Sequence, residues 1–291
     1  MNRCAFLSMD NLQAFECYDH LLYKPFEKEG WEVKNVSWRN NKVNWDYYDA
    51  VIVRSSWDYQ KEPSRFLEVI KKIDSSSARL ANSLEIIGWN IDKSYLKELS
   101  EKNISVVPTI QPPHFSPKNL TDYFSFFKTD EIVIKPLIGA SADDTFWLHK
   151  NASVQPLQAL EKAFNHTSFM VQPFIKSVIE KGEYSLFFFY DTYSHAILKT
   201  PAEGDFRVQE EHGGTLRTVK PASQLLQTAE DVMQMLPAQP LYARLDFAEK
   251  DGAFLLMEAE LIEPSLYFNM DADSPSRFVE AFKKWWNAFT A

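Results

Sequence analysis

Two apolar segments near the end of the chain, residues 242–247 and 255–265, predict a β-hairpin with three acidic side chains on one face. Successive side chains of a strand point to opposite faces, so Glu258 and Glu260 share a face and the alanine between them lies on the other. An Asp-Gly pair between the segments is typical of a tight hairpin turn, which would bring Asp246 opposite the two glutamates. The sequence therefore predicts three carboxylates crowded on one sheet face.

Such a cluster of carboxylates needs a cation to neutralise it. Hard oxygen ligands suit Mg2+ or Mn2+, and these ions usually keep some water and bind phosphate oxygens as well. A Glu-x-Glu pattern can instead mark a solvated strand face, but Leu255, Leu256 and Leu261 flank the acids and favour a metal site. Arg244 lies two residues before Asp246 and shares its face, where a guanidinium is suited to stabilising a tetrahedral oxyanion. We therefore expect a nucleoside triphosphate as the first substrate.

Composition excludes several classes of partner. The 291 residues, 45% of them hydrophobic, can form one large domain or two. The net charge of -9 argues against nucleic acid, because phosphate backbones are bound by concentrated Lys and Arg. No apolar run approaches the roughly 18 residues of a membrane helix, and the N-terminal apolar stretch is too short for a signal peptide. We expect a cytoplasmic protein with no membrane partner, in which Cys4 and Cys17 are reduced core thiols rather than a disulfide.

The first part of the chain alternates strands and helices. Strands are predicted at 5–9, 31–36 and 50–54, and helices at 12–28 and 64–73. This order is typical of a small open α/β unit with a mostly parallel sheet, in which ligands bind beyond the carboxyl ends of the strands. Arg54, Ser55 and Trp57 follow the third strand directly and form a candidate site loop. A structural loop with a buried Trp57 and a surface Arg54 is the alternative.

From about residue 91 onward the organisation changes. Apart from the acidic hairpin, helices are predicted at 93–102, 118–128, 156–164, 223–235 and 276–289, and strands at 131–136, 168–171, 184–190 and 194–198. Three aromatic residues of the last helix, Trp285, Trp286 and Phe289, fit either a core or the face of a homodimer.

Two further basic residues stand beside flexible loops. Lys135 ends a short apolar strand and precedes a loop of small residues that can bind phosphates through backbone N–H groups, although a strand-end lysine is often only a surface residue. Arg207 lies near His212, Gly213 and Gly214, where its guanidinium can hold a phosphoryl group or a carboxylate in a bidentate fork. A hairpin turn with a solvent-facing Arg207 is the alternative.

Motifs of several other site classes are missing. No Gly-Lys-Ser/Thr follows the small-residue loop, so it is not a Walker A loop, and no Gly-x-Gly-x-x-Gly fingerprint occurs. The histidines and cysteines show no zinc-ligand spacing, and there is no Gly-x-Ser-x-Gly elbow. Phosphate binding is therefore the interpretation with the fewest rivals.

Several short motifs occur in an order that resembles a known family. They are Trp89-Asn-Ile-Asp-Lys93, Ile134-Lys-Pro-Leu-Ile-Gly139, Met170-Val-Gln-Pro-Phe-Ile175, Lys181-Gly-Glu-Tyr-Ser185, Gly204-Asp-Phe-Arg207 and the acidic hairpin. In this order they resemble the ATP-grasp superfamily, most closely the branch similar to bacterial glutathione synthetase, from residue 89 to residue 267. Two phrases, Val53 to Tyr59 and Glu260 to Ser265, resemble a subgroup that includes a cyclo-ligase of cycloserine biosynthesis.

The resemblance implies a role for each motif. It assigns the ATP phosphates to Lys93, Lys135 and Arg207, the adenine to Gln172, Pro173, Phe174 and Ile175, the ribose to Glu183, and Mg2+ to Asp246, Glu258 and Glu260. It places Arg244 at the tetrahedral oxyanion, and the substrates at Arg54, Ser55, Trp57, His212, Gly213, Gly214 and Ser265, with Arg54 suiting an amino-acid carboxylate. One position departs from the pattern, since many relatives carry asparagine where this chain has Glu260.

The implied fold is an ATP-grasp fold of mixed α/β and α+β class. A small open parallel-sheet α/β domain at residues 1–87 would bind substrate, and an ATP-grasp domain at 88–291 would grip ATP between lobes at about 88–171 and 172–291. The implied reaction activates a small-molecule carboxylate, an amino acid or small peptide, as an acylphosphate and joins it to an amine. An intramolecular cyclo-ligase and a catalytically inactive nucleotide-binding sensor or assembly protein are the alternatives.

Overall fold

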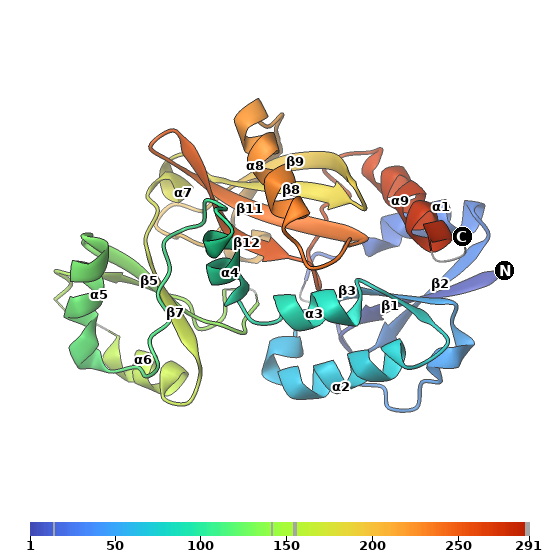
Figure 1. Ribbon diagram of the computed structural model, residues 1–291, viewed down its shortest axis with the longest axis horizontal. Helices are drawn as coiled ribbons and strands as arrows, with labels where there is room; N and C mark the ends of the chain where they lie inside the picture. The colour runs from blue at the N-terminus through green and yellow to red at the C-terminus, as the bar shows by residue number, and fades with distance from the viewer. Residues whose placement is uncertain (14, 141, 154–155, 289–291) are drawn as a thin grey trace.

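The computed structural model describes residues 1–13, 15–140, 142–153 and 156–288, and their strands form three sheets. Figure 1 shows the N-terminal sheet at one end of the molecule, a small sheet at the other end, and a five-stranded sheet between them. None of the helices in these ranges is long and apolar enough to cross a membrane.

The N-terminal sheet is entirely parallel, as the alternation of strands and helices predicts. Its strands are β1 (Asn2–Ser8), β2 (Trp31–Ser37), β3 (Ala50–Ser55) and β4 (Arg79–Ala81), in the order β2-β1-β3-β4. Alternate residues of β1 face opposite layers. Cys4 and Phe6 pack with helix α1 (Tyr23–Lys28), whereas Ala5 and Leu7 pack with helix α2 (Pro63–Asp74).

The helix predicted at 12–28 is much shorter than expected. Among the described residues of this range, only a 3-10 turn (Asp19–Leu22) and α1 are helical, and Cys17 lies before them in an irregular segment. Pro25 explains the difference, because a proline is tolerated in the first turn of a helix but breaks its interior. Both cysteines are free thiols, as predicted.

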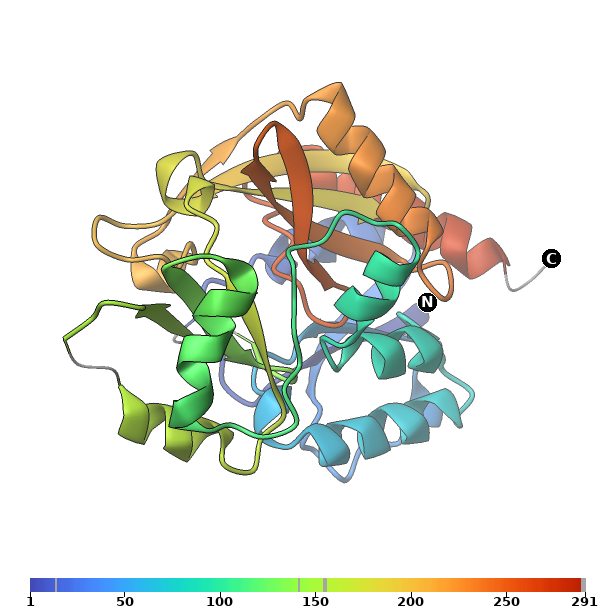
Figure 2. The ribbon, with the colours of Figure 1, turned by 60° about the vertical axis from the view of Figure 1, so that its left-hand side comes forward.

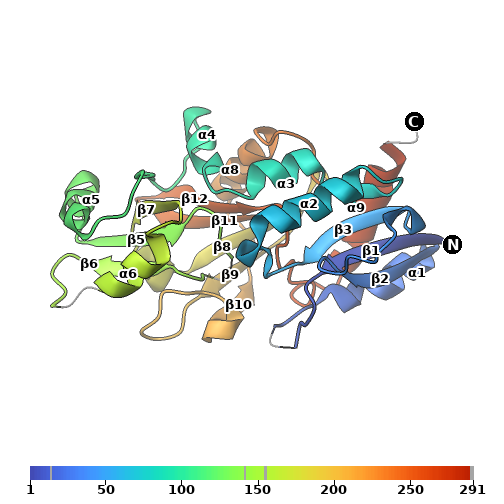
Figure 3. The same cartoon turned by 90° about the horizontal axis from the view of Figure 1, so that it is seen from below.

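The last helix, α9 (Ser274–Ala288), returns to the N-terminal sheet, as Figure 3 shows. Phe282 and Trp285 are buried in the same core as Phe26 and Trp31, and the rings of Trp31 and Phe282 lie 4.8 Å apart, edge to face. Trp286 is partly buried and packs against this core, so Trp285 is a core residue and Trp286 lies at the edge of the core. Phe289, the third aromatic residue of that prediction, lies outside the described residues.

The small sheet carries its two helices on one face. It consists of β5 (Glu131–Pro136), β6 (Phe146–His149) and β7 (Phe169–Pro173) in the antiparallel order β6-β5-β7, with helices α5 (Leu120–Phe127) and α6 (Leu157–Phe164) packed against it (Figure 2). Ile132 and Ile134 point into this helical core, whereas Val133 and Lys135 line a cavity on the opposite face. The period of two along β5 therefore places Lys135 at the cavity.

The five-stranded sheet is antiparallel and contains the acidic hairpin. Its order is β10-β9-β8-β11-β12, formed by β8 (Glu183–Phe189), β9 (Thr192–Thr200), β10 (Thr215–Thr218), β11 (Tyr242–Lys250) and β12 (Ala253–Glu260). Asp251 and Gly252 form the turn with φ of +52° and +79°, the left-handed conformations that a two-residue hairpin of type I′ requires. The predicted hairpin is confirmed.

Strand β12 lies at the edge of its sheet, but its backbone is not left unpaired. Asn90, at the end of helix α3 (Leu84–Asn90), donates from Nδ2 to the Ala259 carbonyl (2.8 Å) and accepts from the Leu261 amide (2.9 Å). The Tyr95 hydroxyl, at the start of helix α4 (Tyr95–Glu101), accepts from the Ala259 amide at 2.9 Å. These bonds hold the backbone that carries Glu258 and Glu260.

The remaining helices and 3-10 turns connect or cover the three sheets. They are α7 (Ser177–Glu180), α8 (Ser223–Gln234), which packs on the five-stranded sheet, and the 3-10 turns Trp45–Tyr47, Tyr59–Lys61, Pro117–Asn119 and Glu210–His212.

Candidate functional site

The acids of the hairpin lie on one face of β11 and β12, as predicted. Asp246 pairs directly with Glu258 across the two strands, and Arg244 pairs with Glu260. A bulge follows Asp246, so the alternation of side chains changes only beyond these residues. The register therefore brings two acid-bearing pairs together on the same surface.

Asp246 is buried among cations. Its carboxylate accepts hydrogen bonds from the Arg244 guanidinium (Nη2 to Oδ2, 3.0 Å), from Lys199 Nζ (3.3 Å) and from the Ser185 hydroxyl. Burial opposes ionisation, but Arg244 and Lys199 outweigh it and lower the pKa of Asp246 to about 2. Asp246 is therefore a carboxylate at neutral pH.

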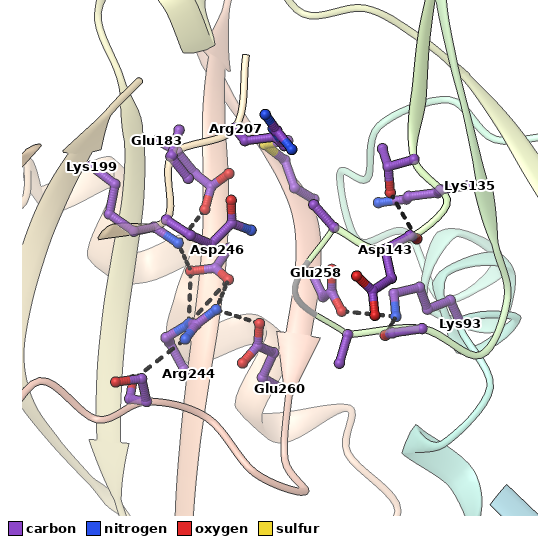
Figure 4. Close-up of a pocket in the computed structure, with 18 of the residues that line it drawn as sticks. Lys93, Lys135, Asp143, Glu183, Lys199, Arg207, Arg244, Asp246, Glu258 and Glu260 are labelled. Atoms are coloured by element: carbon purple, nitrogen blue, oxygen red, sulfur yellow. Dashed lines mark hydrogen bonds and ion pairs between the residues drawn. The ribbon is translucent and has the colours of Figure 1, made fainter. Parts of the chain in front are cut away.

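The two glutamates of β12 turn to different cations (Figure 4). Glu258 pairs with Lys93 (Nζ to Oε1, 3.1 Å), and although burial opposes it, Lys93 and Lys135 lower the pKa of Glu258. Glu260 pairs with Arg244, yet burial raises its pKa to about 7, and Asp246 and Glu258 add to the rise. Glu260 is thus the acid of the hairpin that ionises least readily.

The expected crowding of three carboxylates is relieved by these cations. Within the described ranges, no group of three acidic, histidine or cysteine side chains is arranged as a ready metal site. The side chains of Asp246, Glu258 and Glu260 nevertheless offer only carboxylate oxygens as ligands. Negatively charged oxygen ligands are the type that Mg2+ and Mn2+ prefer. The hairpin residues therefore fit a hard divalent ion by donor type.

Two lysines from the other side of the cavity face the hairpin. Lys93 lies just before α4 rather than inside the predicted helix, and its Nζ donates to the Gly139 carbonyl at 2.6 Å, which ties it to the small-residue loop after β5. Lys135 is enclosed, and burial, with Lys93 as a further cause, lowers its pKa. In the described part of the chain Lys135 has no ion pair, so its ammonium is free for an anion. Ser141, in the middle of this loop, lies outside the described residues.

Lys199 is a functional candidate that the sequence interpretation missed. It lies near the end of β9, opposite Glu183 in the sheet, and its buried Nζ bridges the carboxylates of Glu183 and Asp246. Asp246 and Glu183 overcome the effect of burial and raise its pKa. The signal was the one that identified Lys135, a lysine ending an apolar strand, but that strand was predicted to end at residue 198.

These residues surround one cavity of about 230 Å³ between the lobes and the N-terminal sheet. Of the predicted residues, the cavity is lined by Trp57, Lys93, Lys135, Gln172, Pro173, Phe174, Ile175, Glu183, Arg207, Arg244, Asp246, Glu258, Glu260 and Ser265. Residues 172–175 end β7 and lead into the next lobe, and Phe174 is supported by a stacked Trp147 ring at 4.4 Å. The predicted lobe boundary at 171/172 falls inside β7.

Arg207 lines the cavity, but the glycines near it do not. Its guanidinium forms a fork with Asp205 (Nη2 to Oδ2, 2.7 Å), which lowers the pKa of that carboxyl. Gly213 and Gly214 are not among the residues that line this cavity, so their assignment to a substrate loop stays a prediction. Gly214 has a local reason to be glycine, because a Cβ there would lie 2.2 Å from the Val208 carbonyl oxygen. His212 lines a neighbouring cavity.

The loop after β3 was also only partly predicted. Arg54 is buried, neither on the surface nor on the cavity wall, and binds Asp19 (Nη2 to Oδ1, 2.8 Å) and the Pro264 carbonyl (3.2 Å). Ser55 is buried as well and does not line the cavity. Neither residue reaches the cavity in this structure, whereas Trp57 lines it, and the substrate contacts of all three residues stay predictions.

The architecture and the site can now be compared with those of known proteins. The structure superposes on D-cycloserine synthetase DcsG with a TM-score of 0.84 and 23% identity, covering 98% of this chain and 100% of the other. It superposes on D-alanine–D-alanine ligase from Bacillus anthracis complexed with ATP with a TM-score of 0.70 and 14% identity, covering 99% and 98%. The parallel four-stranded domain followed by two antiparallel lobes is therefore an ATP-grasp fold, as expected.

The sequence comparisons define the family. Residues 104–250, about half of the chain, match the ATP-grasp domain of prokaryotic glutathione synthetase, and the chain belongs to this family of ATP-grasp ligases. Residues 4–82 match the N-terminal domain of D-cycloserine synthetase DcsG. The cycloserine biosynthesis protein DcsG of Streptomyces lavendulae is 28% identical over 260 residues, which cover 84% of this chain and 85% of that protein.

Proposed function

We propose that this protein is an ATP- and Mg2+-dependent ligase that activates the carboxylate of an amino acid or small peptide as an acylphosphate and joins it to an amine or similar nucleophile. The observation that carries the proposal is the array of cations around one cavity. Lys93, Lys135 and Arg207 line the cavity from separate segments, and Lys199 adds a fourth cation beside the hairpin acids. Four cations around one cavity suit a triphosphate.

In this proposal ATP lies between the two lobes. The backbone of residues 172–175 holds the adenine and Glu183 binds the ribose, while the four cations bind the phosphates. Asp246, Glu258 and Glu260 would hold Mg2+ or Mn2+, and a bound ion would supply charge neutralisation for the phosphates. The N-terminal unit, residues 1–87, closes the cavity from the substrate side, which Trp57 lines.

The reaction follows from these positions. A carboxylate oxygen of the substrate attacks the terminal phosphorus, the bond to the bridging oxygen breaks, and ADP leaves. The nucleophile then adds to the carbonyl carbon of the acylphosphate, and phosphate leaves as the tetrahedral intermediate collapses. Arg244 is held by Asp246 and Glu260 at the cavity wall, and its guanidinium stabilises the oxyanion of that intermediate.

The test is an ATP turnover assay with Mg2+ and pools of amino acids and dipeptides. We expect at least one pool to stimulate release of ADP and phosphate, and Asp246→Asn to abolish the stimulation. Mass spectrometry of the products separates a linear ligation product from a cyclic one. ATP binding without turnover under every pool would indicate the inactive nucleotide-binding alternative, and release of AMP would contradict the acylphosphate step.

A further inference from the structure

The basic and acidic side chains of the cavity are unevenly distributed. Its basic lining residues are Lys93, Lys135, Lys199, Arg207 and Arg244, and all except Lys135 and Arg207 pair with Glu183 or with an acid of the hairpin. Arg207 pairs with Asp205. The remaining acids of the wall include Glu16, Glu210, Glu211 and Glu263. None of these four has an ion pair with a basic side chain of the described residues.

Glu263 is the member of this group whose ionisation is influenced by the hairpin residues Glu258, Glu260 and Arg244. It follows Glu260 by three residues, and burial, together with Glu260 and Glu258, raises its pKa well above the usual range. Lys93 and Arg244 offset this only in part. The Glu263 carboxyl has no hydrogen bond or ion pair within the described residues, so a cation arriving in the cavity would meet an uncompensated acid.

The backbone around Glu263 is fixed by three donors. Trp57 donates from Nε1 to the Glu263 carbonyl (2.7 Å), Arg54 donates to the Pro264 carbonyl (3.2 Å), and the Tyr242 hydroxyl donates to the Ile262 carbonyl (2.8 Å). The unpaired side chain therefore stands on a rigid segment, as a preorganised recognition group requires.

The cation that could have neutralised this segment is already engaged. Arg54 lies directly behind it, but its guanidinium makes two hydrogen bonds to Asp19, at 3.0 and 2.8 Å. On the cavity side the wall is aromatic, with Trp57, Tyr59 and Tyr267, and the carboxyl of Glu263 is near enough to raise the pKa of Tyr59. An acid beside aromatic faces suits an ammonium group.

We propose that Glu263 binds the ammonium group of the carboxylate substrate, so that the ligase selects amino acids with a free ammonium over neutral carboxylates and dicarboxylates. This inference rests on the proposed function and names the substrate class of the same cavity. The substrate carboxylate faces Arg244, and its ammonium faces Glu263 and the aromatic wall. Glu263 is a specificity-determining residue and takes no part in the phosphoryl transfer.

The experiment compares matched carboxylates in a hydroxylamine trapping assay that captures the activated acyl group as a hydroxamate. Each D- and L-amino acid of a panel is tested beside the same acid with its ammonium acetylated or replaced by hydroxyl, and beside dicarboxylates. We expect kcat/KM to be about 10- to 100-fold higher for the ammonium-bearing member, the size of effect that a charge-assisted hydrogen bond produces.

The Glu263→Gln variant tests whether the Glu263 carboxylate binds the substrate ammonium. We expect a 10-fold or larger increase in KM for the best amino acid, with the KM for ATP and the kcat/KM for its acetylated partner unchanged within about twofold. Glu230→Gln is the matched control, because Glu230 is exposed on α8, and it should behave as wild type. Should Glu263→Gln fail to fold, the wild-type comparison of matched carboxylates decides alone.

The outcomes separate the two proposals. If no carboxylate of any kind yields a hydroxamate, the proposed ligase function fails and this inference fails with it. If neutral and acidic carboxylates react as well as amino acids, the ligase function stands and the role of Glu263 is refuted. The same holds if Glu263→Gln keeps the wild-type preference for the ammonium.

Discussion

The acidic side chains at the two ends of the cavity differ in whether they have basic partners. Around the hairpin each acid has a basic partner, as Asp246 has Arg244 and Lys199 and Glu258 has Lys93. At the other end, Glu263 and Glu211 line the wall, and neither has an ion pair with a basic side chain among the described residues. A paired network is rigid and keeps its protonation states before any ligand arrives, whereas unpaired acids gain stability only when a cationic ligand binds. The difference suits the proposed function, in which the nucleotide binds at the paired end and the substrate binds at the unpaired end.

The largest expected effect comes from removing one charge of the paired end. Asp246→Asn should lower kcat by at least about 1,000-fold. The substitution removes a proposed metal ligand, and it removes the negative charge that pairs with Arg244 and Lys199. The measurement is steady-state ADP release at saturating Mg2+. Asp74→Asn, an exposed residue at the end of α2, is the matched control. A kcat within tenfold of wild type would show that the hairpin is not the metal end.

A second large effect is expected at the bridging lysine. Lys199→Met should reduce ATP turnover about 100-fold and lower the free energy of unfolding by about 3 kcal/mol, because Glu183 and Asp246 lose a shared buried cation. Steady-state ADP release measures the change in turnover, and urea denaturation measures the change in stability. Lys71→Met, on the exposed face of α2, should change neither. If Lys199→Met bound ATP and turned it over normally, Lys199 would have a purely structural role.

A smaller effect is expected where the chain departs from its relatives. Glu260→Asn should keep kcat within about tenfold of wild type, since a carboxamide oxygen remains a hard ligand and Asp246 still holds Arg244. The Mg2+ concentration for half-maximal turnover is the sensitive measurement, and it should rise with the loss of one negative charge. A loss of activity as large as that of Asp246→Asn would make Glu260 indispensable to this site.

A separate effect is expected outside the cavity, where stability changes and turnover does not. His195 is buried, stacked on Phe187 at 4.3 Å, and burial lowers its pKa to about 4. The unfolded chain therefore takes up a proton at higher pH than the folded one, and unfolding becomes easier as pH falls from 6.5 towards 4, by up to about 3 kcal/mol. His195→Gln should flatten this dependence in urea titrations at pH 7 and pH 5. An unchanged pH slope would show that His195 is protonated in the folded state.

Much of this fold could be predicted from local patterns. The Asp-Gly turn and the Glu-x-Glu alternation identified β11 and β12, and a lysine at the end of an apolar strand identified Lys135. These signals are local, because strand alternation and turn conformation depend on neighbouring residues.

The remaining features depend on contacts between distant residues, which no local pattern contains. Arg54 meets Asp19 because a 3-10 turn brings that aspartate to the end of β3, and α9 joins the N-terminal sheet from the other end of the chain. Lys199 also lies near the end of an apolar strand, but its position opposite Glu183 depends on the register between β8 and β9. Gly213 and Gly214, the glycines predicted in a substrate loop, meet local backbone requirements. Gly213 has a positive φ, and a side chain on Gly214 would clash with the Val208 carbonyl.

The most direct test of the central claim follows oxygen atoms. The carboxylate that stimulates turnover most strongly is labelled with 18O and incubated with enzyme, Mg2+ and ATP, and the released phosphate is analysed by mass spectrometry. If the carboxylate attacks the terminal phosphate of ATP, one labelled oxygen passes from the substrate to each phosphate released with the ligated product. Unlabelled phosphate, or label found in AMP, would contradict activation of the substrate as an acylphosphate.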